Sequence, residues 1–191
     1  MRKYDPVTLW LHAALATGVI IELALESVMH VPAGVGQGVQ DWHREAFELH
    51  AHFGPTVAVI CVLHWVWICL PFSRPGVAYL FPWVRREGRS VLSREVQDLL
   101  RFKLPPSGAP SRLVSTVHGA GLLAVTGSVV GGTVSYLGYY AGVPIPRQVL
   151  HWAALELIFT SWFVWPFVIG HVSMALWHRF ADDRVGSARS F

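Results

Sequence analysis

The sequence predicts an all-α membrane protein, folded as a bundle of four transmembrane helices. Hydrophobic residues make up 53% of the 191 residues and charged residues only 14%, and the mean hydropathy is +0.43, which is more apolar than a typical soluble domain. Four apolar segments are also long enough to cross a bilayer, which takes about 20 residues. We therefore expect a single four-helix domain over residues 1–191.

The four apolar segments run over residues 7–29, 47–72, 113–139 and 149–180. Small residues at helical spacing allow helices to pack closely in lipid. The third segment has such a set: Gly119, Gly121, Gly127, Gly131 and Gly132.

The connection between the second and third segments is basic and has a short apolar pattern. Its apolar residues recur at helical spacing among charges: Val91, Leu92, Val96, Leu99 and Leu100. We expect a short amphipathic helix on the cytoplasmic membrane face. The alternative is a solvated linker.

The basic residues indicate the orientation of the chain. All of the 15 Lys and Arg residues except Arg44 and Arg147 fall on one side of the four segments. By the positive-inside rule, this predicts that both termini are cytoplasmic. No nucleic-acid-binding motif accompanies the net charge of +3, so we expect the lipid bilayer, and not nucleic acid, as the partner of this charge.

Two histidines are expected at matched depth in the membrane. His12 lies near the cytoplasmic end of the first segment, and His171 lies about two turns before the cytoplasmic end of the fourth. Two imidazoles facing each other across a bundle suit axial ligation of a haem iron. Zinc would usually require a third or fourth ligand nearby.

The second segment has two more histidines on one face. His50 and His64 are 14 residues apart, which is almost four helical turns and about 21 Å. This spacing places His50 at an outer redox level and His64 at the inner level of His12 and His171. A single histidine at a membrane interface is more often a hydrogen-bonded residue than a ligand.

Other polar residues in the segments have more than one interpretation. His118 can hydrogen-bond a haem propionate, a quinone or a neighbouring helix, and His178 shares the face of His171 near the cytoplasmic interface. Glu22 and Glu156 lie in the outer half, where charge is costly unless it is paired. They either relay protons or remain protonated or hydrogen-bonded at the interface.

The chain resembles the bacterial cytochrome b561 superfamily, and within it the b-type cytochrome subunits of membrane-bound nickel-iron hydrogenases and related dehydrogenases. Four features match: Tyr4-Asp5-Pro6-Val7 leading to Leu11-His12, His50 four residues before Gly54, the basic amphipathic connection, and the fourth-segment motif Phe167-Val168-Ile169-Gly170-His171-Val172-Ser173-Met174-Ala175-Leu176. The resemblance implies a four-helix bundle in the bacterial inner membrane that binds b haem through histidines.

By this resemblance, His12 and His171 are the ligands of one haem, and His50 is a ligand of a second. Relatives with two haems have another histidine 14 residues before the position of His171, and Leu157 stands there in this chain. His151 can serve His50 only if the helix starts late or bends. His64 stands where relatives commonly have an arginine that is thought to hold a propionate, so it either takes that role or binds haem itself.

The predicted cofactors are therefore one or two b haems, with a quinone site near His118, Trp177, His178 and the amphipathic connection. We expect electron transfer between the quinone pool and a redox partner, such as a dehydrogenase or hydrogenase subunit or a c-type cytochrome. Two alternatives stay open: a stand-alone quinone-coupled oxidoreductase of the superoxide oxidase or metal reductase type, and a haem-free scaffold or transporter. Association into a homo-oligomer is also left open.

Overall fold

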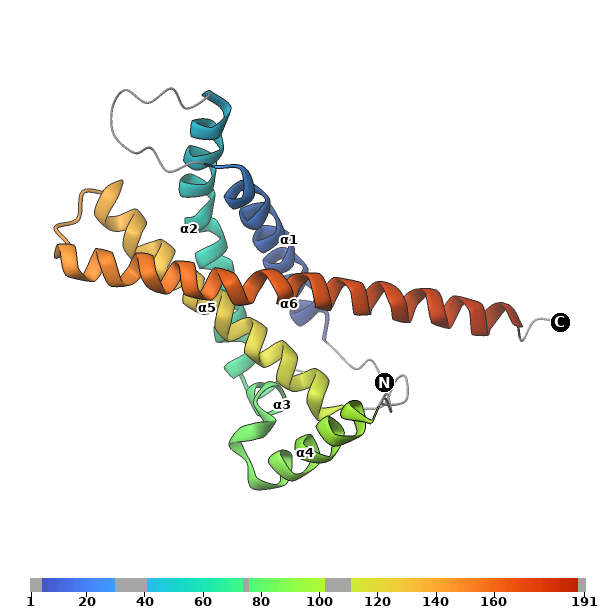
Figure 1. Cartoon of the computed structure of the whole chain (residues 1–191). Coiled ribbons are helices and arrows are strands. Elements are labelled where there is room, and N and C mark those ends of the chain that lie inside the picture. The colour runs from blue at the N-terminus through green and yellow to red at the C-terminus, as the bar shows by residue number, and fades with distance from the viewer. Residues whose placement is uncertain (1–4, 30–40, 74–75, 102–110, 189–191) are drawn as a thin grey trace. The chain divides into compact units, whose positions relative to one another are not determined.

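The computed structural model describes residues 5–29, 41–73, 76–101 and 111–188, with the side chains of Asp41 and of residues 177–188 left undescribed. The described part is helical, as Figure 1 shows. Its elements in chain order are α1 (Pro6–Val28), α2 (Asp41–Cys69), α3 (Val77–Leu80), the 3-10 helix η1 (Pro82–Val84), α4 (Arg86–Leu100), α5 (Arg112–Tyr139) and α6 (Arg147–Ala188).

Four helices in the described part are long and apolar enough to cross a membrane. They are Pro6–Val28, Trp42–Cys69, Arg112–Tyr139 and Arg147–Leu176. The predicted all-α membrane fold class is confirmed. Helix α2 begins at Asp41, earlier than the expected residue 47, and α6 continues through Pro166.

The chain divides into two compact units. The first unit contains Met1–Val77 and Leu123–Ser161, and the second contains Ala78–Leu122 and Trp162–Phe191. Helices α5 and α6 each contribute one part to each unit. The expectation of a single domain over residues 1–191 stays a prediction.

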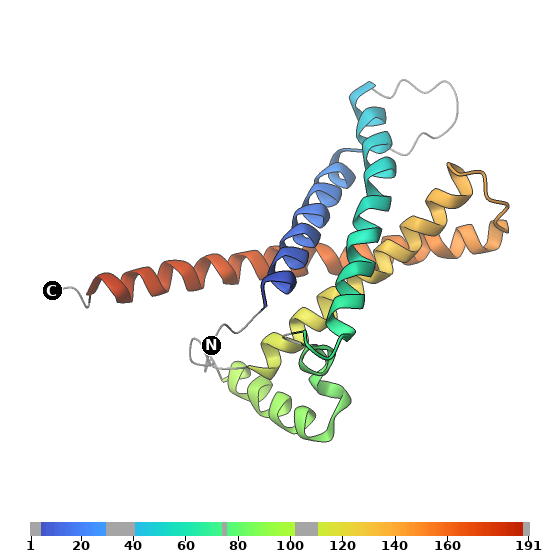
Figure 2. The same cartoon turned by 180° about the vertical axis from the view of Figure 1, so that it is seen from behind.

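In the first unit, α1 and α2 lie side by side in both views (Figures 1 and 2). Asp5 caps α1 by accepting a hydrogen bond from the Thr8 N–H at 2.8 Å. The Thr8 hydroxyl oxygen accepts one from the Trp67 indole N–H at 3.0 Å. Further along, a Cβ atom on Gly18 would lie 3.0 Å from Val57. The glycine therefore allows the two helices to pack closely.

The first unit also contains the end of α5 packed on the start of α6. Gly127, Gly131 and Gly138 lie where a Cβ atom would meet α6 side chains, those of Glu156, Thr160 and Leu150 among them. The Ser128 hydroxyl donates to the Thr160 hydroxyl at 2.9 Å. The glycine-rich pattern in the third predicted segment thus corresponds to a close helix contact.

In the second unit, α4 is attached to the first turn of α5. Glu95 of α4 accepts hydrogen bonds from the Ser111 hydroxyl at 2.8 Å, the Arg112 N–H at 3.1 Å and the Leu113 N–H at 2.7 Å. These backbone N–H groups have no partner within their own helix, so Glu95 acts as an N-terminal cap from a neighbouring element. No residue of α4 is buried, and the predicted amphipathic helix is confirmed.

Candidate functional site

His50 on α2 contacts Glu22 on α1 within the first unit. The contact joins the Nδ1 atom of the imidazole to a carboxylate oxygen of Glu22, and the two side chains are only 27% and 14% exposed. These atoms are buried and have no other hydrogen-bond partner among the described residues beyond this pair. Because Nδ1 is engaged, Nε2 is the ring nitrogen left to bind a metal.

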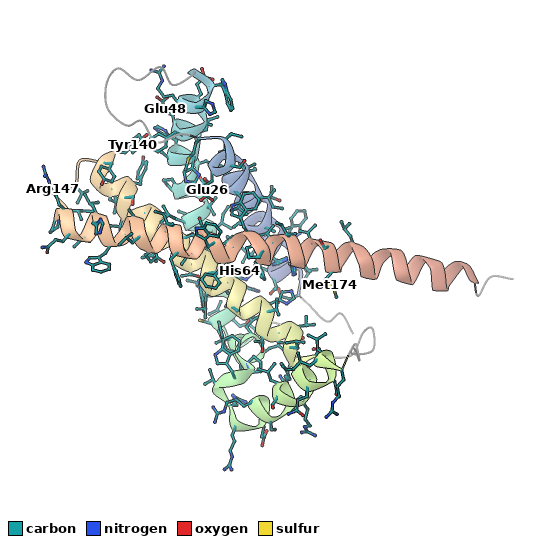
Figure 3. The ribbon with its side chains drawn as sticks, in the orientation of Figure 1. Glu26, Glu48, His64, Tyr140, Arg147 and Met174 are labelled. Carbon is teal, nitrogen blue, oxygen red and sulfur yellow. The ribbon has the colours of Figure 1, made fainter. Side chains whose placement is uncertain are left out.

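His64 lies in the same helix, and its residue is only 7% exposed. Its Nδ1 atom is buried and has no hydrogen-bond partner in the described part of the chain. Figure 3 shows His64 apart from Glu48, which lies nearer the start of α2. A buried imidazole atom with an unmet hydrogen bond is a candidate for contact with a bound group.

His12 and His151 also belong to the first unit and are both exposed. His151 lies just over one turn into α6, because that helix begins at Arg147, and its ring lies 6.1 Å from that of Trp152. The late helix start that would have brought His151 toward His50 is not observed. A pairing of His50 with His151 stays a prediction.

In the second unit, α5 and α6 bring two candidate histidines together. The ring centroids of His118 and His171 are 4.7 Å apart, with the rings nearly perpendicular. The Nδ1 atom of His118 is 2.7 Å from the Val114 carbonyl oxygen, to which it donates, so its Nε2 is the other available nitrogen. Phe167 stacks on His171 at 5.5 Å. Phe167 also occupies the space where a Cβ atom on Gly121 would lie.

The remaining predicted site residues are not brought together within one unit of the described structure. His12 belongs to the first unit and His171 to the second, so their pairing stays a prediction. The side chains of Trp177 and His178 lie outside the described part of the structure. Glu156 lies against Gly127 and Gly131 of α5, and its expected proton-relay role also stays a prediction.

Nearly the whole chain matches one protein family. The family model described as prokaryotic cytochrome b561 aligns with residues 3–188, which include all four spanning helices. The chain belongs to the prokaryotic cytochrome b561 family. No curated protein and no solved structure matches it.

Membership in the cytochrome b561 family establishes an integral membrane protein that transfers electrons through b-type haem. Haem supplies one-electron redox chemistry when it is bound, and the protein supplies ligands, burial and an electron path. The family assignment favours this function over the haem-free alternative.

The donor groups of this cytochrome b561 chain fit such a cofactor. No three or more His, Cys, Asp or Glu residues among the described ones are grouped to hold a metal ion on their own. Haem would not require such a cluster, because its porphyrin binds the iron and single histidines would supply the ligands from the protein. In His50 and His118, Nδ1 contacts another residue of the protein. The Nε2 atom of each ring is therefore the nitrogen available to a bound group.

Two contacts in this cytochrome b561 site were missed by sequence reasoning. Glu22 was expected to relay protons or to remain protonated or hydrogen-bonded, and sequence reasoning did not identify His50 as the residue that it contacts. The available signal was that both residues fall in the outer half of neighbouring antiparallel segments. Gly121 was recognised only as part of a glycine-rich segment, and nothing in the pattern indicated Phe167 as the residue against it.

Proposed function

We propose that this cytochrome binds a b haem through His12 and His171 and passes electrons between a redox partner and the quinone pool of the bacterial inner membrane. The observation that carries the proposal is the family match over residues 3–188, because it includes both histidines in their spanning helices. Two neutral imidazoles favour a low-spin iron that changes redox state with little movement.

A second haem would use His50 as a ligand at the outer level. The contact of His50 with Glu22 supports this role, because histidine ligands usually donate their other ring N–H to a carboxylate or a carbonyl. Leu157 stands where relatives with two haems have a histidine. We therefore propose His151 as the alternative partner, and a single-haem protein if His151 does not reach.

The proposed quinone site is at the inner level, near His118, Trp177, His178 and helix α4. The ring contact between His118 and His171 supports it, because a quinone hydrogen-bonded to His118 would lie close to a haem ligated by His171. His64, which is buried with an unpartnered Nδ1, is the proposed contact of a haem propionate or a further haem ligand.

The proposed orientation has both termini and α4 in the cytoplasm, in agreement with the positive-inside rule. A redox partner on either face would be a dehydrogenase or hydrogenase subunit, or a c-type cytochrome. The stand-alone oxidoreductase is the alternative that the experiment below separates from this arrangement.

The test is to add a quinol to native membranes that contain the tagged cytochrome and to record the reduced-minus-oxidised spectrum. Reduction of a b-type haem by the quinol, together with co-purification of a redox subunit, is the expected result. Reduction of the haem by quinol without any co-purifying subunit would contradict the role as a subunit of a complex and would support the stand-alone oxidoreductase. A haem that dithionite reduces and quinol does not would contradict coupling to quinone.

A further inference from the structure

The contact between Glu22 and His50 crosses from one spanning helix to the next, in a part of the chain where a charge is costly. A carboxylate inside a membrane span needs a partner or water. The Glu22 side chain is only 14% exposed, and its partner in the structure is the Nδ1 atom of His50. The imidazole of His50 is therefore the group that stabilises the Glu22 carboxylate in this part of the chain.

The surrounding residues allow the two side chains to meet. Gly54 follows His50 by one helical turn on the same face of α2, and a Cβ atom there would lie 3.8 Å from Glu22 Oε1. Gly18 precedes Glu22 by one turn on α1 and packs against Val57 of α2. The small residues on both helices bring the backbones close enough for the carboxylate to reach the ring.

We propose that Glu22 is a positioning residue that holds His50 through Nδ1, so that Nε2 is directed to a haem iron. This inference rests on the proposed function, in which His50 is a ligand of the outer haem. The carboxylate selects the tautomer with hydrogen on Nδ1, fixes the ring orientation and increases the electron density on Nε2. An imidazole of this kind stabilises ferric iron relative to ferrous iron and so lowers the reduction potential.

Two other carboxylates provide controls that distinguish the effect of the Glu22–His50 contact from the effect of a nearby negative charge. Glu26 lies one turn beyond Glu22 on α1, whereas Glu48 precedes His50 on α2. Glu26 and Glu48 are labelled in Figure 3. The Glu48 side chain is 57% exposed and lies 4.0 Å from Arg44. Glu26→Gln would remove a nearby charge and keep the Glu22 contact. Glu48→Gln would remove a charge that is already paired in solvent.

The experiment compares the purified full chain with five variants: Glu22→Gln, Glu22→Ala, Glu22→Asp, Glu26→Gln and Glu48→Gln. The measurements are haem per chain, the reduction potentials from a redox titration, and the electron paramagnetic resonance signal of the oxidised protein. We expect Glu22→Gln to raise the potential of one haem and to change its low-spin ferric signal. We expect Glu22→Ala to weaken retention of that haem by about 10- to 100-fold, as for other residues that support metal ligands.

The conservative variant and the controls complete the test. Glu22→Asp keeps the carboxylate and should retain more haem than Glu22→Ala. Glu26→Gln should leave the ferric signal unchanged. Glu48→Gln should match the native protein in all three measurements. Equal effects of Glu22→Gln and Glu26→Gln on both potential and ferric signal would overturn the positioning role, because charge alone would then explain them.

A His50→Ala variant separates failure of this inference from failure of the proposed function. Loss of one haem in His50→Ala together with a native spectrum in Glu22→Gln would overturn only the role of Glu22. Full haem content in His50→Ala would overturn the inference and leave electron transfer through the inner haem intact. A native chain without b haem would overturn both.

Discussion

The rings of His118 on α5 and His171 on α6 meet edge to face, with their centroids 4.7 Å apart. The contact belongs to a small cluster in which Phe167 stacks on His171 and fills the space beside Gly121. The orientation of the proposed ligand His171 therefore depends on a residue of α5 that has no side chain.

Replacement of Gly121 by alanine should disturb this cluster. The added Cβ atom would overlap the Phe167 ring, and overpacking of this kind costs about 1–3 kcal/mol. We expect Gly121→Ala to retain several-fold less haem than the native protein after extended washing in detergent. Gly132→Ala is the matched control, because a Cβ atom there has no neighbour within 4 Å among the described residues. Equal haem content in the two variants would contradict the role of Gly121.

Gly131 and Gly132 provide a second comparison within one turn of α5. A Cβ atom on Gly131 would meet the Glu156 carboxylate and the backbone of α6, whereas the position beside it is open. We expect Gly131→Ala to reduce the free energy of unfolding by about 1–3 kcal/mol. Gly132→Ala should be neutral or stabilising by up to about 1 kcal/mol, since alanine is the better helix former.

Thermal unfolding of the two variants in detergent checks this prediction. Combining Gly131→Ala with Glu156→Ala should recover part of the loss, because the carboxylate is one of the groups in the way. A Gly131→Ala protein as stable as Gly132→Ala would show that the close contact of α5 with α6 is not present.

Glu95 should make the attachment of α4 to α5 sensitive to acid. Desolvation acts to raise the pKa of this carboxyl, but hydrogen bonds from Leu113, Ser111 and Arg112 outweigh it and lower the pKa below the ordinary value of 4.5. The cap therefore stabilises the attachment fully above that ordinary value. Its contribution is lost as the pH falls through the lowered value in the folded protein.

Hydrogen exchange at the Leu113 amide measures this attachment. Loss of an N-terminal cap costs about 1 kcal/mol, so the Glu95→Gln protection factor at neutral pH should be about fivefold lower than in the native protein. In Glu95→Gln, the protection of the Leu113 amide should also no longer fall as the pH is lowered through the pKa of Glu95. Glu87→Gln, a change at an exposed residue in the first turn of α4, is the control. Unchanged protection in Glu95→Gln would show that the cap contributes nothing.

Hydropathy and charge were sufficient to predict the spanning helices and α4. A spanning helix must bury a long apolar run, and α4 alternates apolar and charged residues with a helical period, so each leaves a signal within its own segment. The start of α2 at Asp41 was missed because its first turns are polar and read as a loop.

Contacts between helices were harder to predict than the helices themselves. Sequence reasoning gave the depth of Glu22 and His50 but not the rotation of each helix about its axis, which decides that the two side chains meet. Similarly, the glycines of the third segment predicted close packing without indicating that Phe167 and Glu156 are the residues packed there. The pairing of His12 with His171 rests on matched depth and family resemblance, and it stays a prediction.

The most direct test of the account is haem content in His12→Ala and His171→Ala, measured with the reduced-minus-oxidised spectrum of each purified protein. His52→Ala, at an exposed histidine of α2 that has no proposed role in haem binding, is the comparison. We expect both ligand variants to keep their helical content and to lose one b haem per chain. The same amount of haem and an unchanged spectrum in either variant would contradict ligation by His12 and His171.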